Sequence, residues 1–110
     1  MQRFVKFLEL VDDPELIQQY RDVHARVWPE ILQGIRSVGI SSMDIYLIGN
    51  KAVMIMECPD GIDVDAAMDR LGRLPRQQEW EQYVSRMQQC RPGDTSDQKW
   101  KVMQQIFSLD

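Results

Sequence analysis

The sequence predicts an α+β fold, in which a four-stranded antiparallel sheet carries helices on one face. The chain has 110 residues, 44% hydrophobic and 27% charged, and this size and composition are typical of one globular domain spanning residues 1–110. Two runs of alternating apolar residues flank a Gly49-Asn50 turn, which is the pattern of a β-hairpin. A further strand pattern lies near each end of the chain, and helical patterns separate both from the hairpin.

The first strand and the first helix are predicted near the start of the chain. Residues 3–10 mix apolar and charged side chains and suit a strand better than a helix, because a helix start signal follows closely. Asp12 and Asp13 supply capping carboxylates before Pro14, which suits the first position of a helix. The residues expected to face the interior from this helix are Leu16, Tyr20, Val23 and Val27.

Pro29 is expected to divide the following helical segment in two. A proline disfavours helical geometry at the residue before it, so we expect Trp28 at a corner of the chain. A second helix is predicted from Pro29 to about Val38, with Gly39 as its C-cap. Its apolar residues at core spacing are Ile31, Leu32, Ile35 and Val38.

The remaining patterns complete a β-α-β-β-α-β order. The two hairpin strands carry Met43, Ile45 and Leu47 and then Val53 and Ile55. We expect amphipathic helices near residues 64–71 and 76–87, a loop over 92–95 and a final strand over 101–109. This is the split β-α-β order of ferredoxin-like sandwiches. Small versions often pair their open sheet faces, so a homodimer forming a dimeric α+β barrel is expected.

Charge and cysteine usage limit the classes of partner. The net charge of −4 and the scattered basic residues argue against nucleic acid and anionic membranes as partners. No run approaches the ~20 apolar residues of a membrane span. Cys58 and Cys90 lack metal-site spacing, so we expect no metal and two free thiols in a cytoplasmic protein. The methionines expected to fill the core include Met54, Met56, Met68, Met87 and Met103.

The only histidine, His24, is the first candidate for catalysis. Tyr20 and His24 are four residues apart, so they share a helix face with about 5–6 Å between Cβ atoms. An imidazole can give and take a proton near neutral pH. Together with Trp28, the two side chains suggest the lining of a small-molecule pocket. The alternatives are a structural histidine and a tryptophan that fills the core.

A second cluster of candidate pocket residues consists of Glu79, Trp80, Glu81 and Tyr83. Trp80 and Tyr83 are three residues apart and meet on one helix face. Either both belong to the core, or Trp80 closes a pocket to which a neighbouring carboxylate contributes a hydroxyl acceptor. Asp44 lies on a strand face opposite the apolar residues, and it is either a solvated carboxylate or a substrate contact.

Four segments together are similar to one enzyme family. They are Tyr20-x-x-x-His24-x-x-x-Trp28-Pro29-Glu30, Ile45-Tyr46-Leu47, Trp80-x-x-Tyr83 and Gln105-Ile106-Phe107-Ser108-Leu109. The chain resembles the L-rhamnose mutarotase family, small dimeric enzymes that interconvert the α and β anomers of a 6-deoxy sugar. The resemblance implies that His24 is the proton donor and that Tyr20 and Trp80 contact the sugar.

The chain departs from that family at two sugar-contacting aromatic residues. Met43 replaces a tyrosine, and Glu81 replaces a second tryptophan. A carboxylate in place of a ring changes which hydroxyl stereochemistry is preferred, so both L-rhamnose and L-fucose are candidate substrates. The residues expected to contact the sugar are Tyr20, Trp28, Asp44, Trp80 and Glu81.

Mutarotation requires one acid and one base. We expect His24 to be the acid toward the ring oxygen, with the base among Asp44, Glu81 and a bound water, and no cofactor. Two other functions fit the same residues. One is a haem- or aromatic-binding protein with His24 as ligand or base, and the other is a sugar-binding domain without catalysis.

Overall fold

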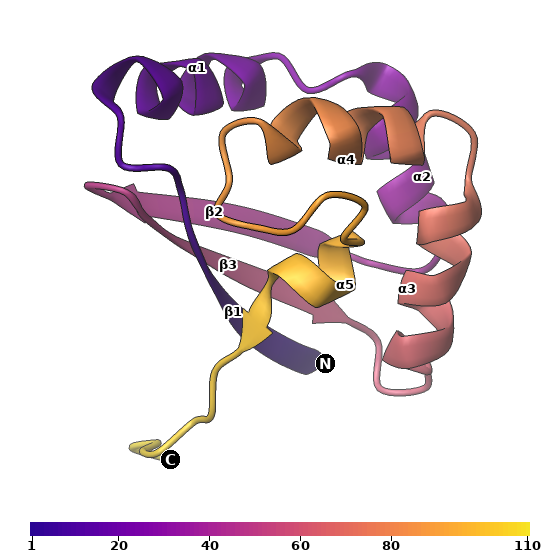
Figure 1. Ribbon diagram of the computed structural model, residues 1–110. Coiled ribbons are helices and arrows are strands. Elements are labelled where there is room, and N and C mark those ends of the chain that lie inside the picture. Colours follow the sequence, from indigo (N-terminus) through magenta and orange to yellow (C-terminus); the bar gives the residue numbers. More distant parts are fainter.

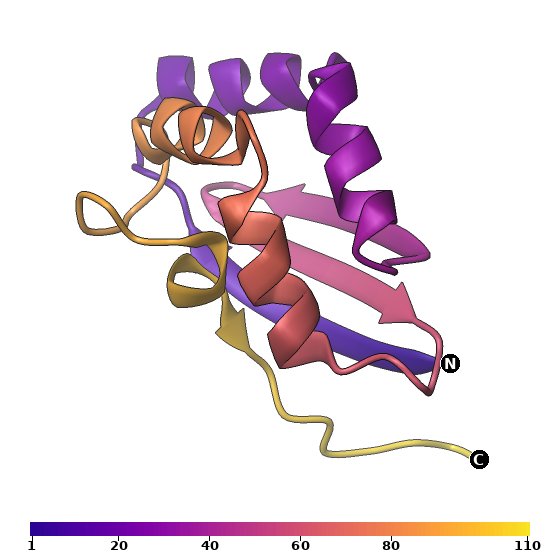
Figure 2. The ribbon, with the colours of Figure 1, turned by 90° about the vertical axis from the view of Figure 1, so that its right-hand side faces the viewer.

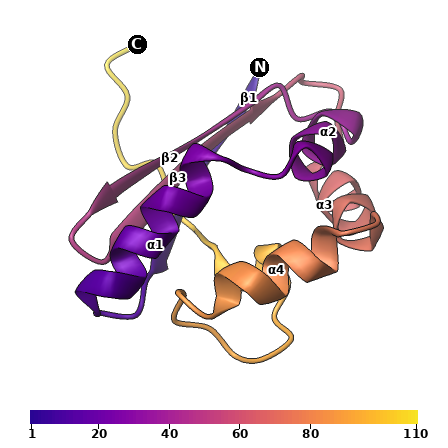
Figure 3. The ribbon, with the colours of Figure 1, turned by 90° about the horizontal axis from the view of Figure 1, so that it is seen from above.

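A computed structural model describes residues 1–110 and confirms the predicted α+β fold (Figure 1). The elements in chain order are β1 (Gln2–Glu9), α1 (Pro14–Ala25), α2 (Pro29–Ser37), β2 (Ser42–Ile48), β3 (Lys51–Cys58), α3 (Val64–Arg73), α4 (Gln77–Ser85), α5 (Ser96–Lys99) and β4 (Lys101–Val102). The sheet order is β2-β3-β1-β4, and every neighbouring pair is antiparallel. Helices α1 to α4 lie on the same side of the sheet, as the view from above shows (Figure 3).

The two central strands, β1 and β3, are paired along their whole length, from Gln2 opposite Cys58 to Glu9 opposite Lys51. Strand β3 is apolar on both faces. Ala52, Met54, Met56 and Cys58 are buried beneath the helices. Val53 and Ile55 alternate with them and lie half-buried on the open face. The open face of the sheet is therefore apolar at its centre.

Local signals place the starts of α1 and α2 where the sequence predicts them, whereas α1 ends at Ala25, before the predicted helical residue Val27. The Asp13 carboxylate accepts hydrogen bonds from the backbone N–H groups of Glu15 and Leu16, at 2.9 and 3.2 Å, and caps α1. Helix α2 begins at Pro29, with Trp28 in an extended conformation before it. Gly39 follows α2 with φ +101°, and a Cβ there would lie 2.9 Å from Ile62 Cδ1, so this position requires glycine.

The interior divides into two apolar clusters. One, which includes Met54, Met56 and Leu71, lies between the sheet and α3. The other lies against α1, α2 and α4 and consists of Leu10, Tyr20, Ile31, Trp80, Val84 and Met87. Ile35 and Leu47 pack against both clusters and join them. The second cluster contains two of the candidate site residues, Tyr20 and Trp80.

The C-terminal segment differs from the prediction. The expected strand over 101–109 is only the two-residue β4, which pairs with Lys6 and Phe7. The chain then leads away from the sheet (Figure 2), and Ile106, Phe107 and Leu109 are 92%, 75% and 90% exposed. A strand needs a neighbour to satisfy its backbone groups, and the single chain offers none to residues 104–110.

The structure also corrects three smaller expectations. Leu32, expected at core spacing in α2, is 39% exposed. Met103 lies in this segment and is 46% exposed, so it is not a core residue, whereas Met54, Met56, Met68 and Met87 are buried. The predicted approach to the last strand contains the short helix α5, whose Thr95 and Gln98 form a capping box. No helix of the fold has the length and apolar character needed to cross a membrane.

Substitution of Met56 tests how much the buried face of β3 contributes to stability. Its side chain is 0% exposed, so Met56→Ala leaves a cavity and is expected to lower the free energy of unfolding by about 2–5 kcal/mol. Gln19→Ala, on the exposed side of α1, should change it by less than about 0.5 kcal/mol. Urea unfolding followed by circular dichroism compares the two, and equal small changes would contradict the assigned core.

Candidate active site

A cavity of about 410 Å³ lies between the sheet and helices α1, α2 and α4, and its lining is mainly apolar. Five of the six predicted site residues border it, namely Tyr20, His24, Asp44, Trp80 and Glu81. Apolar side chains from α2 and β2, including Ile31, Ile35 and Ile45, complete the wall. A largely apolar cavity with a few convergent polar groups is the usual form of a small-molecule site.

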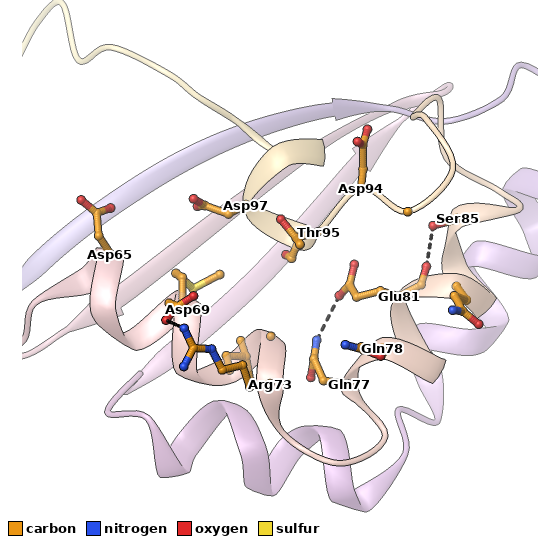
Figure 4. A pocket seen from close by; sticks show the side chains of 16 residues that line it. Asp65, Asp69, Arg73, Gln77, Gln78, Glu81, Ser85, Asp94, Thr95 and Asp97 are labelled. Carbon is orange, nitrogen blue, oxygen red and sulfur yellow. Dashed lines mark hydrogen bonds and ion pairs between the residues drawn. The ribbon is translucent and has the colours of Figure 1, made fainter.

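A second hollow, of about 470 Å³, opens between α3, α4 and residues 93–97 (Figure 4). Its wall is polar and rich in carboxylates, which include Asp65, Asp69, Asp94 and Asp97. Gln77 and Glu81 line both spaces and so form part of the wall between them. We take the first cavity as the candidate site because it alone contains the imidazole, the phenol and the indole.

His24 is held in the last turn of α1 as a neutral base. Its Nδ1 lies 2.8 Å from the backbone carbonyl oxygen of Tyr20, which can only accept a hydrogen bond, so Nδ1 carries the proton. Burial lowers the pKa of His24 below the usual value of 6.5, and the hydrogen bond to the Tyr20 carbonyl opposes part of that shift. The neutral imidazole therefore predominates near pH 7, with a lone pair on Nε2.

Tyr20 presents its hydroxyl group as a permanent donor. Its ring centroid lies 4.3 Å from that of His24, and the residue is 3% exposed. Burial raises the pKa of Tyr20 to about 12, although the hydrogen bond from Gln88 lowers it, and nearby Glu81 raises it further. The phenol thus keeps its proton near neutral pH. Because its oxygen accepts a hydrogen bond from Gln88 Nε2 at 3.2 Å, its own hydrogen is directed elsewhere.

The tryptophans take different positions. Trp80 lines the cavity, and its ring lies edge-on to His24 with 5.7 Å between centroids. Trp28 is not among the lining residues. It packs edge-on against Trp80 at 5.1 Å and stacks on Tyr83, and the Arg76 guanidinium lies 4.6 Å from its ring centroid. The structure therefore places Trp28 behind Trp80, as a support for the cavity wall.

Glu81 is held by a network of polar contacts that Figure 4 shows in part. Lys99 Nζ donates to Glu81 Oε1 at 2.9 Å and also to the Glu81 backbone carbonyl at 2.9 Å. Gln77 Nε2 donates to Glu81 Oε2 at 3.0 Å. The Lys99 side chain is 0% exposed, and that of Glu81 is 16% exposed. Each carboxylate oxygen has one partner and keeps a lone pair for another donor.

Asp44 borders the cavity but is an exposed residue. Its neighbours Met43 and Ile45 face the helices, and alternation along β2 directs the Asp44 side chain to the other face of the sheet. The structure therefore does not bring the Asp44 carboxylate together with His24.

Sequence reasoning missed three polar residues of the site: Gln77, Gln88 and Lys99. Gln88 lies beyond the end of α4 and forms a bridge with Leu10, so helical spacing does not indicate its position. Thr95 and Gln98 have capping-box spacing, which indicates the helix that carries Lys99. No sequence pattern pairs Lys99 with Glu81, because the contact joins α4 to α5 through the tertiary fold.

The site can transfer protons on a small polar molecule. A neutral imidazole nitrogen can accept a proton, a phenol can donate a hydrogen bond and an indole supplies an apolar surface. No group of three or more His, Cys, Asp or Glu side chains is arranged to hold a metal ion.

Comparisons with known proteins agree with this geometry. The family model described as L-rhamnose mutarotase matches residues 3–109. An L-fucose mutarotase from Xanthomonas campestris pv. campestris is 36% identical over 111 residues, which cover 99% of this chain and 89% of that protein. The crystal structure of an L-rhamnose mutarotase from Formosa agariphila has a TM-score of 0.73 at 17% identity, with all of both chains covered. A dimeric ferredoxin-like protein from an uncultured marine organism has a TM-score of 0.56 at 8% identity, covering 98% of this chain and 91% of that one.

Proposed function

The chain belongs to the L-rhamnose mutarotase family, isomerases that act on sugars, and on this premise we propose that it interconverts the α and β anomers of L-fucose. The observation that carries the proposal is the neutral His24 beside the ring of Tyr20, in a cavity walled by Trp80. The cavity volume of about 410 Å³ lies within the range of small-molecule sites, about 300–1,000 Å³.

The protonation state of His24 supports a mechanism that begins with a base. Nε2 takes the proton of the anomeric hydroxyl, the bond between the anomeric carbon and the ring oxygen breaks, and an aldehyde forms. The imidazolium then gives the proton to the ring oxygen, so His24 also performs the acid step expected from the sequence. After the aldehyde rotates, the steps reverse and the ring closes as the other anomer. No metal or other cofactor enters these steps.

The contacts of the other acidic residues support this single-residue cycle. The Asp44 side chain lies on the far face of the sheet, and both carboxylate oxygens of Glu81 already accept hydrogen bonds. In our proposal Tyr20 donates to a sugar oxygen, Trp80 packs against an apolar face of the ring and Trp28 supports Trp80. Glu81 uses a free lone pair to accept from a sugar hydroxyl.

The choice of L-fucose over L-rhamnose rests on the cavity wall. Met43 and Glu81 line the cavity where the resemblance described above implies a tyrosine and a tryptophan in rhamnose enzymes. Glu81 is fixed there by Lys99 and Gln77, so the wall offers a charged acceptor in place of a ring face. The relative at 36% identity is itself named an L-fucose mutarotase.

We further propose that residues 1–110 act as one mutarotase domain that pairs into a cytoplasmic homodimer. Val5, Phe7, Val53 and Ile55 form a half-buried apolar patch on the open face of the sheet, next to Tyr46, which is 62% exposed. Patches of this kind usually mark interfaces. The exposed apolar residues of segment 103–109 add surface that a second copy would cover. Cys58 and Cys90 are free thiols, in keeping with a reducing compartment.

The proposed function predicts three outcomes, the first of which concerns the reaction itself. NMR saturation transfer between anomers should show faster exchange of L-fucose than of L-rhamnose, and no acceleration of D-glucose. His24→Asn should lower the rate of enzymatic exchange at least about 100-fold, because the base is lost. Circular dichroism of the variant controls for folding. A folded His24→Asn protein at full rate would refute the assigned base, and sugar binding without exchange would favour a non-catalytic domain.

The second prediction is the pH dependence of the enzymatic rate. Because the neutral form of His24 starts the reaction and its pKa lies below 6.5, kcat/KM should be constant near pH 7–8 and fall as the pH drops through that pKa. Exchange rates are measured between pH 4.5 and 8 after subtraction of the uncatalysed rate, which itself depends on pH. An enzymatic rate that rises on acidification would mean that the imidazolium starts the reaction.

The third prediction is the mass in solution. Light scattering should give about twice the chain mass of 12.9 kDa. Phe7→Glu should shift the mass toward that of the monomer, because it places a charge in the centre of the patch. Lys101 lies opposite Phe7 in the register, so the new carboxylate has a partner within the fold. Gln19→Glu, at an exposed position of α1, is the matched control, and a monomeric wild type would contradict the dimer.

A further inference from the structure

Gln88 carries the only buried side-chain oxygen or nitrogen atom without a hydrogen-bond partner in the structure. The atom is its amide oxygen, Oε1. The residue is 5% exposed and lines the candidate cavity. Native proteins satisfy nearly all of their buried polar atoms, so an exception calls for an explanation. The position of this one, at the edge of a small-molecule site, points to a ligand that supplies the missing donor.

The backbone of Gln88 is fixed from two sides. Gln88 forms an isolated antiparallel bridge with Leu10, which is fully buried, and its N–H donates to the Ser85 carbonyl at 3.2 Å. The side chain reaches from this anchor to Tyr20, where Nε2 donates to the phenol oxygen at 3.2 Å. The amide is thus positioned by the fold, and its orientation is set by a residue of the site.

This contact leaves two complementary groups without partners at the same place. Tyr20 uses its oxygen to accept from Gln88, so its own hydrogen is free to be donated. Gln88 uses its nitrogen to donate, so its oxygen is free to accept. One acceptor and one donor side by side match a hydroxyl group, which donates one hydrogen bond and accepts another.

We propose that Gln88, together with Tyr20, recognises one non-anomeric hydroxyl of the sugar and is a specificity-determining residue of the enzyme. The inference rests on the proposed mutarotase function and extends it to a residue that the family resemblance does not include. Oε1 is closed to bulk water, and a small rotation about the soft last torsion, with Nε2 still donating to Tyr20, lets the sugar hydroxyl reach it. The correct sugar satisfies the orphan acceptor, whereas a sugar without that hydroxyl leaves it unpaired.

The test removes the hydroxyl from the sugar and the amide from the protein separately. Exchange is measured for L-fucose and for its 2-deoxy, 3-deoxy and 4-deoxy derivatives, with wild type, Gln88→Met and Tyr20→Phe. For the wild type, kcat/KM should be about tenfold to 100-fold lower with one of the three deoxy sugars than with the other two. The Gln88→Met substitution should lower kcat/KM for L-fucose by a similar factor. Removal of that hydroxyl from the sugar should then lower kcat/KM of the variant only slightly further. Tyr20→Phe should lose discrimination at the same hydroxyl.

Controls distinguish a failure of the proposed role of Gln88 from a failure of the proposed mutarotase function. Gln19→Met carries the same substitution at an exposed position next to Tyr20 and should keep the wild-type pattern. If wild type accelerates no exchange, the proposed function fails, and titration of the same sugars by intrinsic tryptophan fluorescence still tests the role of Gln88 in binding. Equal losses of Gln88→Met on all four sugars, a wild type indifferent to each hydroxyl, or no binding at all would overturn the inference.

Discussion

The break in the helical chain at Trp28 and Pro29 is the constraint on which the site depends. Proline has no backbone N–H to give to a helix and restricts the residue before it, so α1 and α2 cannot continue as one straight helix. The chain turns there, and residues of both helices come to face one cavity with α4. Tyr20 and His24 line it from α1, and Ile31 and Ile35 line it from α2. In one continuous straight helix, these two pairs of residues could not surround a common cavity.

Burial then determines the chemistry of the enclosed side chains. An exposed imidazole and an exposed phenol would titrate near their ordinary values, but here burial lowers the pKa of His24 and raises that of Tyr20. The two residues are consequently a neutral base and a neutral donor across the physiological range. The carbonyl of Tyr20 also fixes which imidazole nitrogen holds the proton. A single helical turn thus positions both groups and sets the tautomer of one.

The polar wall of the cavity depends on one buried ion pair. Glu81 is an anion in a partly buried place, and burial of a charge is costly unless it is paired. Lys99 and Gln77 provide that pairing, and Lys99 comes from the short α5, after the loop that follows α4. The Glu81 carboxylate can therefore stay ionised in the cavity wall only together with these partners. Our proposal assigns specificity for the sugar to the polar network of this wall, which consists of Glu81, Lys99, Gln77, Gln88 and Tyr20.

The sequence by itself determined the features that depend on local patterns. The cap at Asp13 and Pro14, the corner at Trp28, the Gly49-Asn50 hairpin and the shared face of Tyr20 and His24 follow from spacing, because neighbouring residues alone set them. The β-α-β-β-α-β order and the family signature follow in the same way. The tertiary structure decided which face each residue occupies and which other residues it contacts. It put Trp28 behind Trp80, turned Asp44 away and paired Glu81 with Lys99, because these contacts join elements that sequence spacing does not relate.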